Sequence, residues 1–402
     1  MAPTSAYREG QTALAVPSLD EPKMMPAFFN PRGRFVRDVS IVCYNAYSVE
    51  RSAKSRQNFA DSLTGTGARG IRVANEVSSI DQVFLNDINS RALEFAKKSA
   101  KMNDVEGKCV FSRSEVCSFL TSRIQNDGER FDFLDVDPFG SPSDFVDCAI
   151  RAAKDGGLVS LTATDSAVLC GVYPRVALRK YLGLSLRTDY CHEVGMRLLY
   201  GLASQTAMRL ETGIEPIFCH HDMHYFRIYF SVKVGNPYSR ENEKKIGFIL
   251  HCFKCGYRSI ISRDAFFSVR DSSSQTRDKS LNQRGSEVSI CPDCGHGGRE
   301  KGGRVAFGGP LWIGNIQARD FVGNCKKISE LPVFKEELDL PLYFDLNSIH
   351  LKKGTSMPKT TAVLEKLMSL GFRASRTRLN PNALRTDATT DILRNVVLEL
   401  AR

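Results

Sequence analysis

The most informative segment of the chain reads FDFLDVDPFGSP, residues 131–142. Its apolar start, residues 131–134, has the composition of a buried strand, and Asp137 lies where that strand ends. Pro138 and Phe139 follow, so a carboxylate is held by a proline beside an aromatic ring. Open α/β sheets bind their ligands at the carboxyl ends of their strands, so this segment predicts both a fold class and a site.

Strand and helix patterns alternate on both sides of this segment, from about residue 56 to 235. A glycine-rich turn, TGTGARG (64–70), leads into a helical stretch that ends near Val77. Three further strands are predicted at 82–85, 109–111 and 158–164. Helices are predicted at 90–103 and from Pro142 to a glycine stop at Gly156-Gly157. This alternation predicts a mostly parallel, Rossmann-like sheet with helices on both faces.

The flanking segments have a different character, which suggests three parts. Residues 1–55 are rich in Pro and Arg, and their segment FFNPRGRFVRD (28–38) is interpreted as a functional loop that contributes to the site. Residues 56–235 form the expected cofactor-binding domain, and residues 236–402 a basic α+β domain. Within the last part, 271–280 is predicted to be a mobile loop, and 358–370 and 387–400 are predicted helices.

The bulk composition is that of a globular protein of two or three domains, with 402 residues, 42% hydrophobic and 25% charged. No run of about 18 apolar residues occurs, so a membrane span is not expected. The first residues lack the apolar core of a signal peptide, so a cytoplasmic, reducing environment is expected. Nothing in the sequence implies a protein partner.

The positive charge is confined to the C-terminal part of the chain. Residues 1–232 contain 27 Lys and Arg against 27 Asp and Glu, whereas residues 233–402 contain 28 against 18. This asymmetry accounts for the whole net charge of +10. A basic C-terminal part suggests that it holds a polyanion such as a nucleic acid, and the alternative is a merely basic, soluble surface.

Four of the twelve cysteines form two Cys-x-x-Cys pairs, CFKCG (252–256) and CPDCG (291–295). Their four thiolates, on two tight turns, predict a structural zinc site. The ligands would be Cys252, Cys255, Cys291 and Cys294. The 35 residues between the pairs exceed the usual spacing, and a disulfide or idle thiols are the alternatives. Several of the eight scattered cysteines lie in apolar surroundings and are expected to be small buried residues.

The glycine-rich turn predicts a cofactor site. Gly65 and Gly67 let a ligand approach the backbone, and Asp87 follows Gly67 by 20 residues, where a dinucleotide fingerprint expects a carboxylate for ribose hydroxyls. The alternative role for Asp87 is a helix N-cap. Glu115, near the end of the predicted strand at 109–111, is placed either to contact adenosine or to lie in solvent. Arg69 is placed to pair with a carboxylate such as that of a methionine moiety.

The cofactor is either a nicotinamide or S-adenosylmethionine, and the acceptor-proline-aromatic motif favours the second. An exocyclic amine on a base is a poor nucleophile, because its lone pair is delocalised into the ring. Asp137 and the Pro138 carbonyl would accept its N–H groups, and Phe139 would stack on the base. Asp137 either orients the amine or also removes its proton. The alternative is that Asp137 caps a turn and Phe139 fills the core.

This geometry implies a limit on the number of methyl groups transferred. A guanine N2 amine carries two hydrogens, so one N–H remains for Asp137 after a first methylation and none after a second. A site of this type is therefore expected to methylate twice and then stop.

Several motifs along the chain resemble one known family, the tRNA (guanine 26-N2)-dimethyltransferases. The resemblance runs from about residue 9 to the end, and its DPFG motif is fairly specific. The matching segments are FFNP (28–31), RD (37–38), GARGIR (67–72), ND (86–87), DPFGSP (137–142), GPLWIG (309–314) and ALRTDA (383–388). Two residues depart from the family pattern: Glu115 stands where the family usually has Asp, and Phe29 where it has Tyr.

The resemblance implies a class I methyltransferase fold, S-adenosylmethionine as methyl donor, and mono- and dimethylation of guanine N2 at position 26 of tRNA. By motif position it implies a catalytic Asp137, with Phe28 and Phe139 near the base. The cofactor contacts that it implies are Arg37, Arg69, Asp87, Glu115 and Val116. Two alternatives are a zinc-containing RNA-binding protein with an inactive methyltransferase-like domain, and a DNA amino-methyltransferase.

Overall fold

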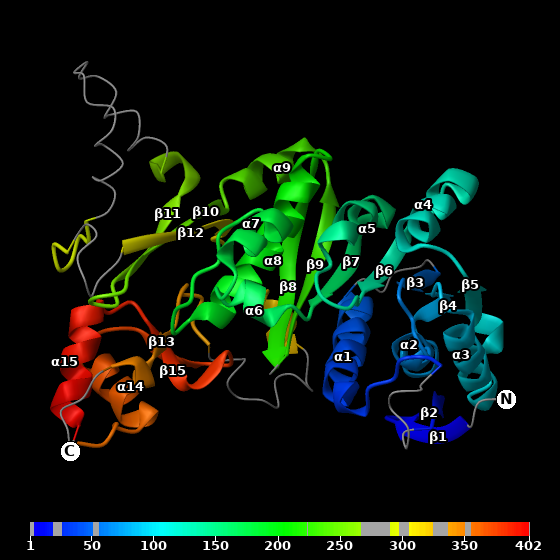
Figure 1. The fold of residues 1–402 in the computed structure, drawn as a ribbon, viewed down its shortest axis with the longest axis horizontal. Coiled ribbons are helices and arrows are strands. Elements are labelled where there is room, and N and C mark those ends of the chain that lie inside the picture. Colours follow the sequence, from blue (N-terminus) through cyan, green and yellow to red (C-terminus); the bar gives the residue numbers. More distant parts are fainter. Residues whose placement is uncertain are drawn as a thin grey trace.

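The computed structural model describes residues 4–18, 26–50, 56–222, 224–266, 290–296, 305–324, 337–349 and 355–401. The molecule is elongated, and its N-terminal and C-terminal halves occupy opposite ends (Figure 1). A seven-stranded sheet forms the centre of the first half, and two three-stranded sheets lie in the second. The predicted mobile loop at 271–280 and Cys325 lie outside the described residues.

The central sheet has the strand order β5-β4-β3-β6-β7-β9-β8. Its strands are β3 (Gln57–Asp61), β4 (Ile80–Asn86), β5 (Cys109–Ser112), β6 (Phe131–Val136), β7 (Ala153–Ala163), β8 (Thr212–Asp222) and β9 (Tyr225–Val234). The first five are parallel, and β9 and β8 are antiparallel. The strand order reverses between β3 and β6, and a sheet of this kind binds its ligand at that point. The expected mostly parallel sheet is confirmed.

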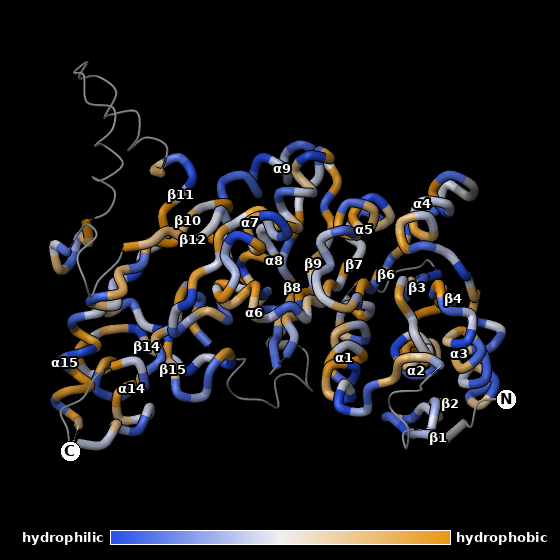
Figure 2. The backbone as a smooth tube through the Cα atoms, in the orientation of Figure 1, coloured by the Kyte–Doolittle hydropathy of each residue, from blue (hydrophilic) through white to orange (hydrophobic). Residues whose placement is uncertain are grey.

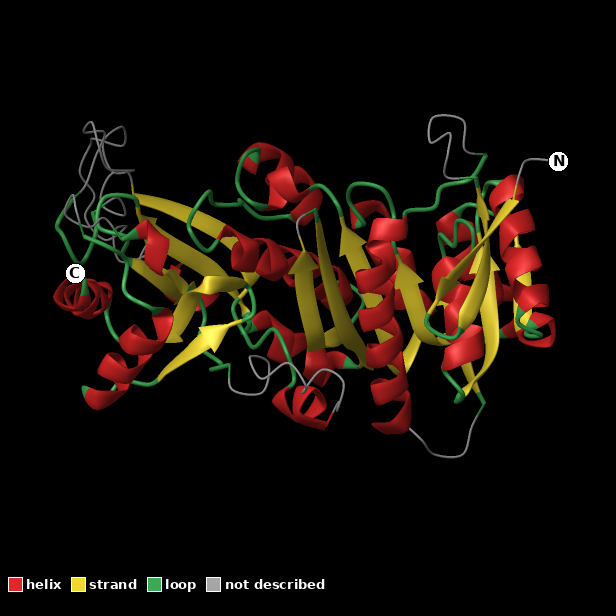
Figure 3. Ribbon diagram, turned by 90° about the horizontal axis from the view of Figure 1, so that it is seen from below, coloured by secondary structure: helices red, strands yellow, loops and turns green. Residues whose placement is uncertain are grey.

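Helices cover both faces of the sheet (Figure 3). One face packs against α1 (Arg34–Glu50), α2 (Ala68–Glu76) and α3 (Ser90–Met102). The other packs against α4 (Val116–Asp127), α5 (Val146–Ala152) and α8 (Cys191–Met208). Because both faces are covered, β6 is buried at all six positions and β3 at all five. The hydrophobic stretch of β4 can be followed in Figure 2. The short elements between these are η3 (Glu106–Lys108), η4 (Ser143–Phe145), α6 (Ser166–Leu169) and α7 (Pro174–Tyr181).

Local sequence explains where several elements begin. Asn89 caps α3 by accepting a hydrogen bond from the Arg91 backbone N–H, and Leu93, Ala96 and Ala100 face the sheet from successive turns. Glu115 caps α4 in the same way. The predicted helix at 90–103 and strands at 82–85 and 109–111 are confirmed to within a few residues.

The predicted glycine stop at Gly156-Gly157 is wrong. Helix α5 ends at Ala152, and both glycines lie inside β7. The pairing between β6 and β7 shifts here, from Phe131 opposite Ala153 to Phe133 opposite Leu158, which defines a bulge. Gly156 has a φ of 70°, so this glycine allows the irregular backbone of the bulge and does not end a helix.

The segment 28–38 is not a loop along its whole length. A single turn, η2 (Pro31–Gly33), leads directly into α1, and Phe29 and Arg37 are buried. Before it, β1 (Thr4–Glu9) and β2 (Thr12–Pro17) form an antiparallel hairpin. The buried Glu9 at the end of β1 accepts two hydrogen bonds from Arg37, which ties the hairpin to α1.

The C-terminal half contains two antiparallel sheets. Their orders are β11-β10-β12 and β13-β15-β14. The strands are β10 (Ile246–Cys252), β11 (Arg258–Ser262), β12 (Val305–Trp312), β13 (Phe344–Asp345), β14 (Ala374–Thr377) and β15 (Asn380–Thr386). The helical elements among the described residues include α9 (Asn236–Glu243), α11 (Arg319–Asn324), η7 (Leu346–Ser348), α14 (Thr360–Ser369) and α15 (Thr390–Leu400). The last two confirm the predicted late helices.

The two halves share a buried interior. The core cluster around β6 and β7 continues into Trp312 on β12 and Ala383 on β15. The buried Glu193 on α8 accepts hydrogen bonds from Arg197 on its own helix and from Arg385 on β15. Among the described residues, no helix is both long and apolar enough to cross a membrane.

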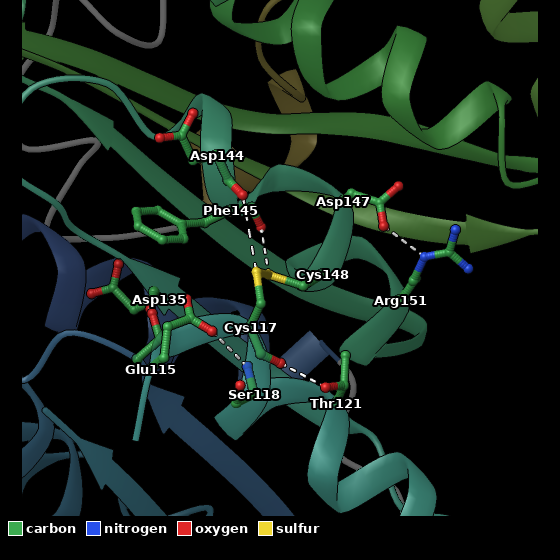
Figure 4. Close-up of a disulfide and its surroundings, with 11 residues drawn as sticks. Glu115, Cys117, Ser118, Thr121, Asp135, Asp144, Phe145, Asp147, Cys148 and Arg151 are labelled. Carbon is green, nitrogen blue, oxygen red and sulfur yellow. Dashed lines mark hydrogen bonds and ion pairs between the residues drawn. A yellow bond between two sulfur atoms is a disulfide. The ribbon is translucent and has the colours of Figure 1, made fainter. Parts of the chain in front are cut away.

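The scattered cysteines behave in three ways. Cys43 and Cys219 are buried thiols, as expected. Cys117 and Cys148 are instead joined in a disulfide between α4 and α5, which isolated positions in the sequence did not reveal (Figure 4). The remaining three described ones, Cys109, Cys170 and Cys191, are half-buried.

Candidate active site

Acidic residues collect at the carboxyl edge of the central sheet because four adjacent parallel strands end there. Asp61 is the last residue of β3, Asp87 follows β4, Glu115 follows β5, and Asp137 follows β6. The topology thus brings together the carboxylates that the sequence placed at separate strand ends. The helix and loop residues that hold each of them decide what the site can do.

Asp137 lies beside an arginine. Nη1 of Arg69, in the first turn of α2, lies 2.7 Å from Oδ2 of Asp137 and 2.5 Å from Oδ2 of Asp135. Burial raises the pKa of Asp137, but the Arg69 and Arg227 guanidinium groups, with hydrogen bonds from Arg69 and Thr162, lower it further, so the net pKa lies below its usual range. Asp137 is therefore an ionised acceptor at neutral pH, and its side chain is 30% exposed.

A buried network under Asp137 was missed from the sequence. Asp135 is fully buried and accepts hydrogen bonds from Arg227 at 3.0 Å and from Ser160 at 3.1 Å. Arg227, on β9, also donates to the hydroxyl groups of Tyr44 and Tyr229. The available signal was an Asp or Arg inside an otherwise apolar strand, because such a group is buried only with a partner. The network fixes Arg69 and, through it, Asp137.

Asp61 contributes a second unusual carboxyl group. Its Oδ2 accepts hydrogen bonds from the Gly70 backbone N–H at 2.9 Å and the Thr64 hydroxyl at 2.8 Å. Burial and the neighbouring Asp135 raise the pKa of Asp61 to about 7, although Arg69 lowers it. This carboxyl group is therefore close to half-protonated at neutral pH, while it secures the glycine-rich turn.

The two glycines of that turn have different surroundings. Both have positive φ angles, 55° at Gly65 and 81° at Gly67. A Cβ on Gly67 would lie 2.7 Å from the Ala96 Cβ, so packing against α3 requires glycine there. A Cβ on Gly65 would meet only the Phe28 carbonyl oxygen, at 3.5 Å, which leaves open space over this part of the loop. Gly65 is thus the position with room for a ligand.

Asp87 organises the rim of that space. Its Oδ2 accepts a hydrogen bond from the Gly65 backbone N–H, and its Oδ1 accepts one from Asn89, each at 2.8 Å. The alternative role as N-cap of α3 belongs to Asn89 instead. Ile88, next to Asp87, is a large exposed apolar side chain that the sequence analysis did not single out.

Three other predicted cofactor contacts lie nearby or in supporting positions. Glu115 is exposed, and its carboxylate accepts a hydrogen bond from the Ser118 backbone N–H at 2.9 Å. Hydrogen bonds from the Cys117 and Ser118 backbone lower its pKa. Val116, the next residue, is buried at the start of α4. Arg37 is bound to Glu9 and to the Asn30 carbonyl, which anchors the segment before α1.

Two exposed aromatic rings lie over the edge of the site. Phe28 is 57% exposed and Phe139 is 75% exposed, and their ring centroids are 4.7 Å apart in an edge-to-face arrangement. Phe139 therefore does not fill the core, which excludes the alternative considered for it. Pro138 is buried and holds the turn between Asp137 and that ring. Exposed rings beside an ionised acceptor suit a flat heterocycle.

The donors present fit S-adenosylmethionine. Nε of the buried Arg69 has no hydrogen-bond partner among the described residues, so a ligand carboxylate would satisfy it. The open space over Gly65, the Asp87 carboxylate and the apolar Ile88 side chain supply the kinds of surface that a nucleoside needs. The residues therefore agree with a nucleoside cofactor that carries a carboxylate.

Comparison with known proteins agrees with the geometry. A family model described as N2,N2-dimethylguanosine tRNA methyltransferase matches residues 10–398. The chain belongs to this family. The chain is 33% identical to the tRNA (guanine(26)-N(2))-dimethyltransferase of Methanothermobacter thermautotrophicus, covering 94% of this chain and 95% of that protein. It is 30% identical to the enzyme of the same description from Pyrococcus abyssi, with 97% of each covered.

A solved structure shares the fold of this family member along its whole length. Trm1 from Pyrococcus horikoshii, in complex with S-adenosyl-L-methionine, superposes with a TM-score of 0.78 at 27% identity. The match covers 98% of this chain and 100% of that one. The class I methyltransferase fold expected from the sequence is therefore confirmed.

The family member also contains a candidate metal centre in its C-terminal half. The ligand atoms of Cys252, Cys255, Cys291 and Cys294 lie within 4.8 Å of one another. The Cys252 and Cys294 sulfurs are 3.9 Å apart, and those of Cys255 and Cys291 are 3.6 Å apart. Four thiolates around zinc, at bonds of about 2.3 Å, would be separated by about 3.8 Å. The donor set fits zinc, and the disulfide alternative is excluded.

Proposed function

We propose that this chain is an S-adenosylmethionine-dependent methyltransferase that mono- and dimethylates the N2 amine of guanine 26 in tRNA. The observation that carries the proposal is the ionised Asp137 at the end of β6, beside the exposed Phe28 and Phe139 rings. An acceptor and two rings select a flat base with an exocyclic amine. The glycine-rich turn follows β3, the strand next to β6, and Asp87 follows β4, the strand after that in the sheet.

Asp137 acts first as an orienting acceptor. It accepts an N–H of the guanine amine, which draws electron density onto nitrogen and aims its lone pair at the methyl group. The Pro138 carbonyl accepts a second N–H, and Phe139 stacks on the base with Phe28 at its edge. Arg69 holds the Asp137 carboxylate while this happens, because Nη1 of Arg69 is itself fixed by the buried Asp135.

The low pKa of Asp137 also bears on proton removal. A carboxylate stabilised by two guanidinium groups is a weak base. The amine becomes a strong acid once it is methylated, because its lone pair is no longer free to delocalise, so a weak base is sufficient. Asp137 therefore accepts the proton after the new bond forms and need not take it before.

When bound, S-adenosylmethionine supplies an electrophilic methyl group. Asp87 would bind the ribose hydroxyls, and Arg69 Nε the methionine carboxylate. Arg37, Gly65, Gly67, Glu115 and Val116 complete the proposed cofactor site. Zinc at the four-cysteine cluster has a structural role, since four thiolates leave no open position for a substrate.

The proposed organisation follows the three predicted parts. Residues 1–55 contribute Phe28 to the active site, residues 56–235 bind the cofactor, and residues 236–402 bind tRNA through a basic surface. A cytoplasmic location remains a prediction.

The test is methylation of an unmodified tRNA transcript followed by nucleoside analysis. We expect N2-methylguanosine first and N2,N2-dimethylguanosine later, and no product from a transcript with adenosine at position 26. Asp137→Ala should bind S-adenosylmethionine and transfer no methyl group. A wild-type chain that binds no S-adenosylmethionine would favour an inactive RNA-binding protein, and methylation of duplex DNA in preference to tRNA would favour a DNA enzyme.

A further inference from the structure

The methyltransferase half has a local basic surface near its candidate active site. Its total charge is balanced, yet residues 166–188 contain four basic residues and no acidic one. These are Arg175, Arg179, Lys180 and Arg187, and all four are exposed. Three of them lie on α7. Among the described residues, none of the four makes an ion pair. We call these four side chains the α7 basic surface.

Helix α7 is fastened to the catalytic loop by its buried face. The hydroxyl group of Tyr181 donates a hydrogen bond to Asp165, the residue next to Thr164. Residues 140 and 164 are joined by two hydrogen bonds, from Thr164 N–H to the Gly140 carbonyl and from Gly140 N–H to the Thr164 hydroxyl. The α7 basic surface is therefore held in a fixed relation to Asp137 and Phe139.

The arrangement of charge on α7 is not explained by the helix itself. Basic residues in the last turn, Arg179 and Lys180, are favoured by the helix dipole, but Arg175 lies in the first turn, where a cation is disfavoured. Arg175 and Arg179 are also spaced i,i+4, so the like charges repel each other. They lie opposite the buried Ala177 and Tyr181, and therefore point together into solvent.

A bound polyanion would neutralise the repulsion between Arg175 and Arg179. The two arginines are separated by a rise of about 6 Å along the helix, which suits consecutive phosphates of one strand. Tyr173, at the N-cap of α7, is an exposed ring that adds a stacking surface beside the charges. Charge with aromatic rings is the usual combination for a single-stranded or distorted nucleic acid.

We propose that the α7 basic surface binds the tRNA backbone next to the nucleotide whose base enters the active site. This inference rests on the proposed function and adds a second RNA contact to the one assigned to the C-terminal part. Phosphate contacts position a nucleic acid without reading its sequence. The surface therefore fixes the register of the target base against Asp137, while the C-terminal part supplies separate affinity.

The test measures tRNA binding and turnover for Arg175→Gln/Arg179→Gln. We expect the Kd for tRNA to rise about tenfold or more, and the slope of log Kd against log salt to fall by about 2. The KM for tRNA should rise in parallel, with kcat at saturating tRNA within about twofold of wild type. The S-adenosylmethionine Kd and the melting temperature should not change. Arg175→Lys/Arg179→Lys, which keeps the charge, should restore most of the affinity.

The matched control is Lys97→Gln/Lys101→Gln, an exposed basic i,i+4 pair on α3 that should leave the tRNA Kd and its salt slope unchanged. If wild type methylates tRNA and the α7 double variant has the same Kd, slope and KM as wild type, the inference is wrong and the proposed function stands. A wild-type chain that does not methylate tRNA fails the proposed function first. If the control pair weakens binding equally, the effect is one of net charge and the surface has no specific role.

Discussion

Three carboxyl groups and two guanidinium groups meet at the end of β3 and β6. Asp61, Asp135 and Asp137 face Arg69 and Arg227, so two carboxylates are balanced and the third is not. The unbalanced negative charge is borne by Asp61, whose pKa is raised, while the pKa of Asp137 is lowered. The residue that must accept a hydrogen bond is therefore kept ionised at the expense of a neighbour that only holds a turn.

Replacing Asp137 by Asn tests the need for charge at nearly constant shape. We expect Asp137→Asn to lower kcat at least about 100-fold, because a neutral amide is a weaker acceptor and cannot take a proton. The S-adenosylmethionine Kd should stay within about threefold. Asp144→Asn, an exposed carboxylate in the next turn of chain, serves as the control. Comparable rates for the two variants would remove Asp137 from the mechanism.

Asp61 should make stability depend on pH in the neutral range. Its folded pKa of about 7 lies above the ordinary value of 3.8, so the folded protein binds the extra proton between these values. Stability is then greatest near the lower value and declines as the pH rises toward 7. We expect the melting temperature to fall by on the order of 3 °C between pH 5 and 8, and Asp61→Asn to flatten that dependence. Equal slopes in both proteins would contradict the assignment.

At the scale of elements, periodic sequence patterns predicted most of the central sheet. Strand and helix patterns before residue 137 were placed within a few residues because each is regular and bounded by caps or turns. The bulge at Gly156 was not predicted, because a glycine pair looks the same at a helix end and in an irregular strand. Two further contacts were not predicted because each joins distant segments: the disulfide between Cys117 and Cys148 and the ion pair between Asp135 and Arg227.

The glycine-rich turn offers a paired experiment. Gly67→Ala must place a Cβ against Ala96 at a φ of 81°, so we expect the free energy of unfolding to fall by about 2–4 kcal/mol. Gly65→Ala meets open space, so its loss of stability should be only about 1 kcal/mol. Its main effect should be a higher Kd for S-adenosylmethionine. Denaturant titration and calorimetry separate the two, and a Gly65 variant with unchanged affinity would place the cofactor elsewhere.

At the scale of the molecule, buried ion pairs join the two halves. Glu193 on α8 and Glu337 before β13 both accept hydrogen bonds from Arg385. Burial raises the pKa of Glu193, but Arg385 and Arg197 lower it further, to about 2. The sequence suggested separate domains from its charge asymmetry. It could not indicate this junction, because Glu193 and Arg385 lie 192 residues apart in the chain.

Removal of zinc should loosen the C-terminal end and leave the active site intact. Arg394 on α15 donates a hydrogen bond to the Cys255 carbonyl, so the cysteine cluster supports that helix. We expect Cys291→Ser to lose bound zinc and to lower the melting temperature by at least about 3 °C. The S-adenosylmethionine Kd should remain within about twofold. Metal analysis with Cys109→Ser as control checks this, and full zinc content in Cys291→Ser would exclude that ligand.

Trp312 is the only tryptophan in the chain, and it is buried on β12, where its indole N–H donates to the Asn315 carbonyl. Its place in the core shared by both halves makes it a natural optical probe of their junction. Intrinsic fluorescence excited in the indole band should remain nearly constant while the donor or the RNA binds at the sheet edge. It should change only when the junction opens, so an emission shift during unfolding would time the separation of the two halves.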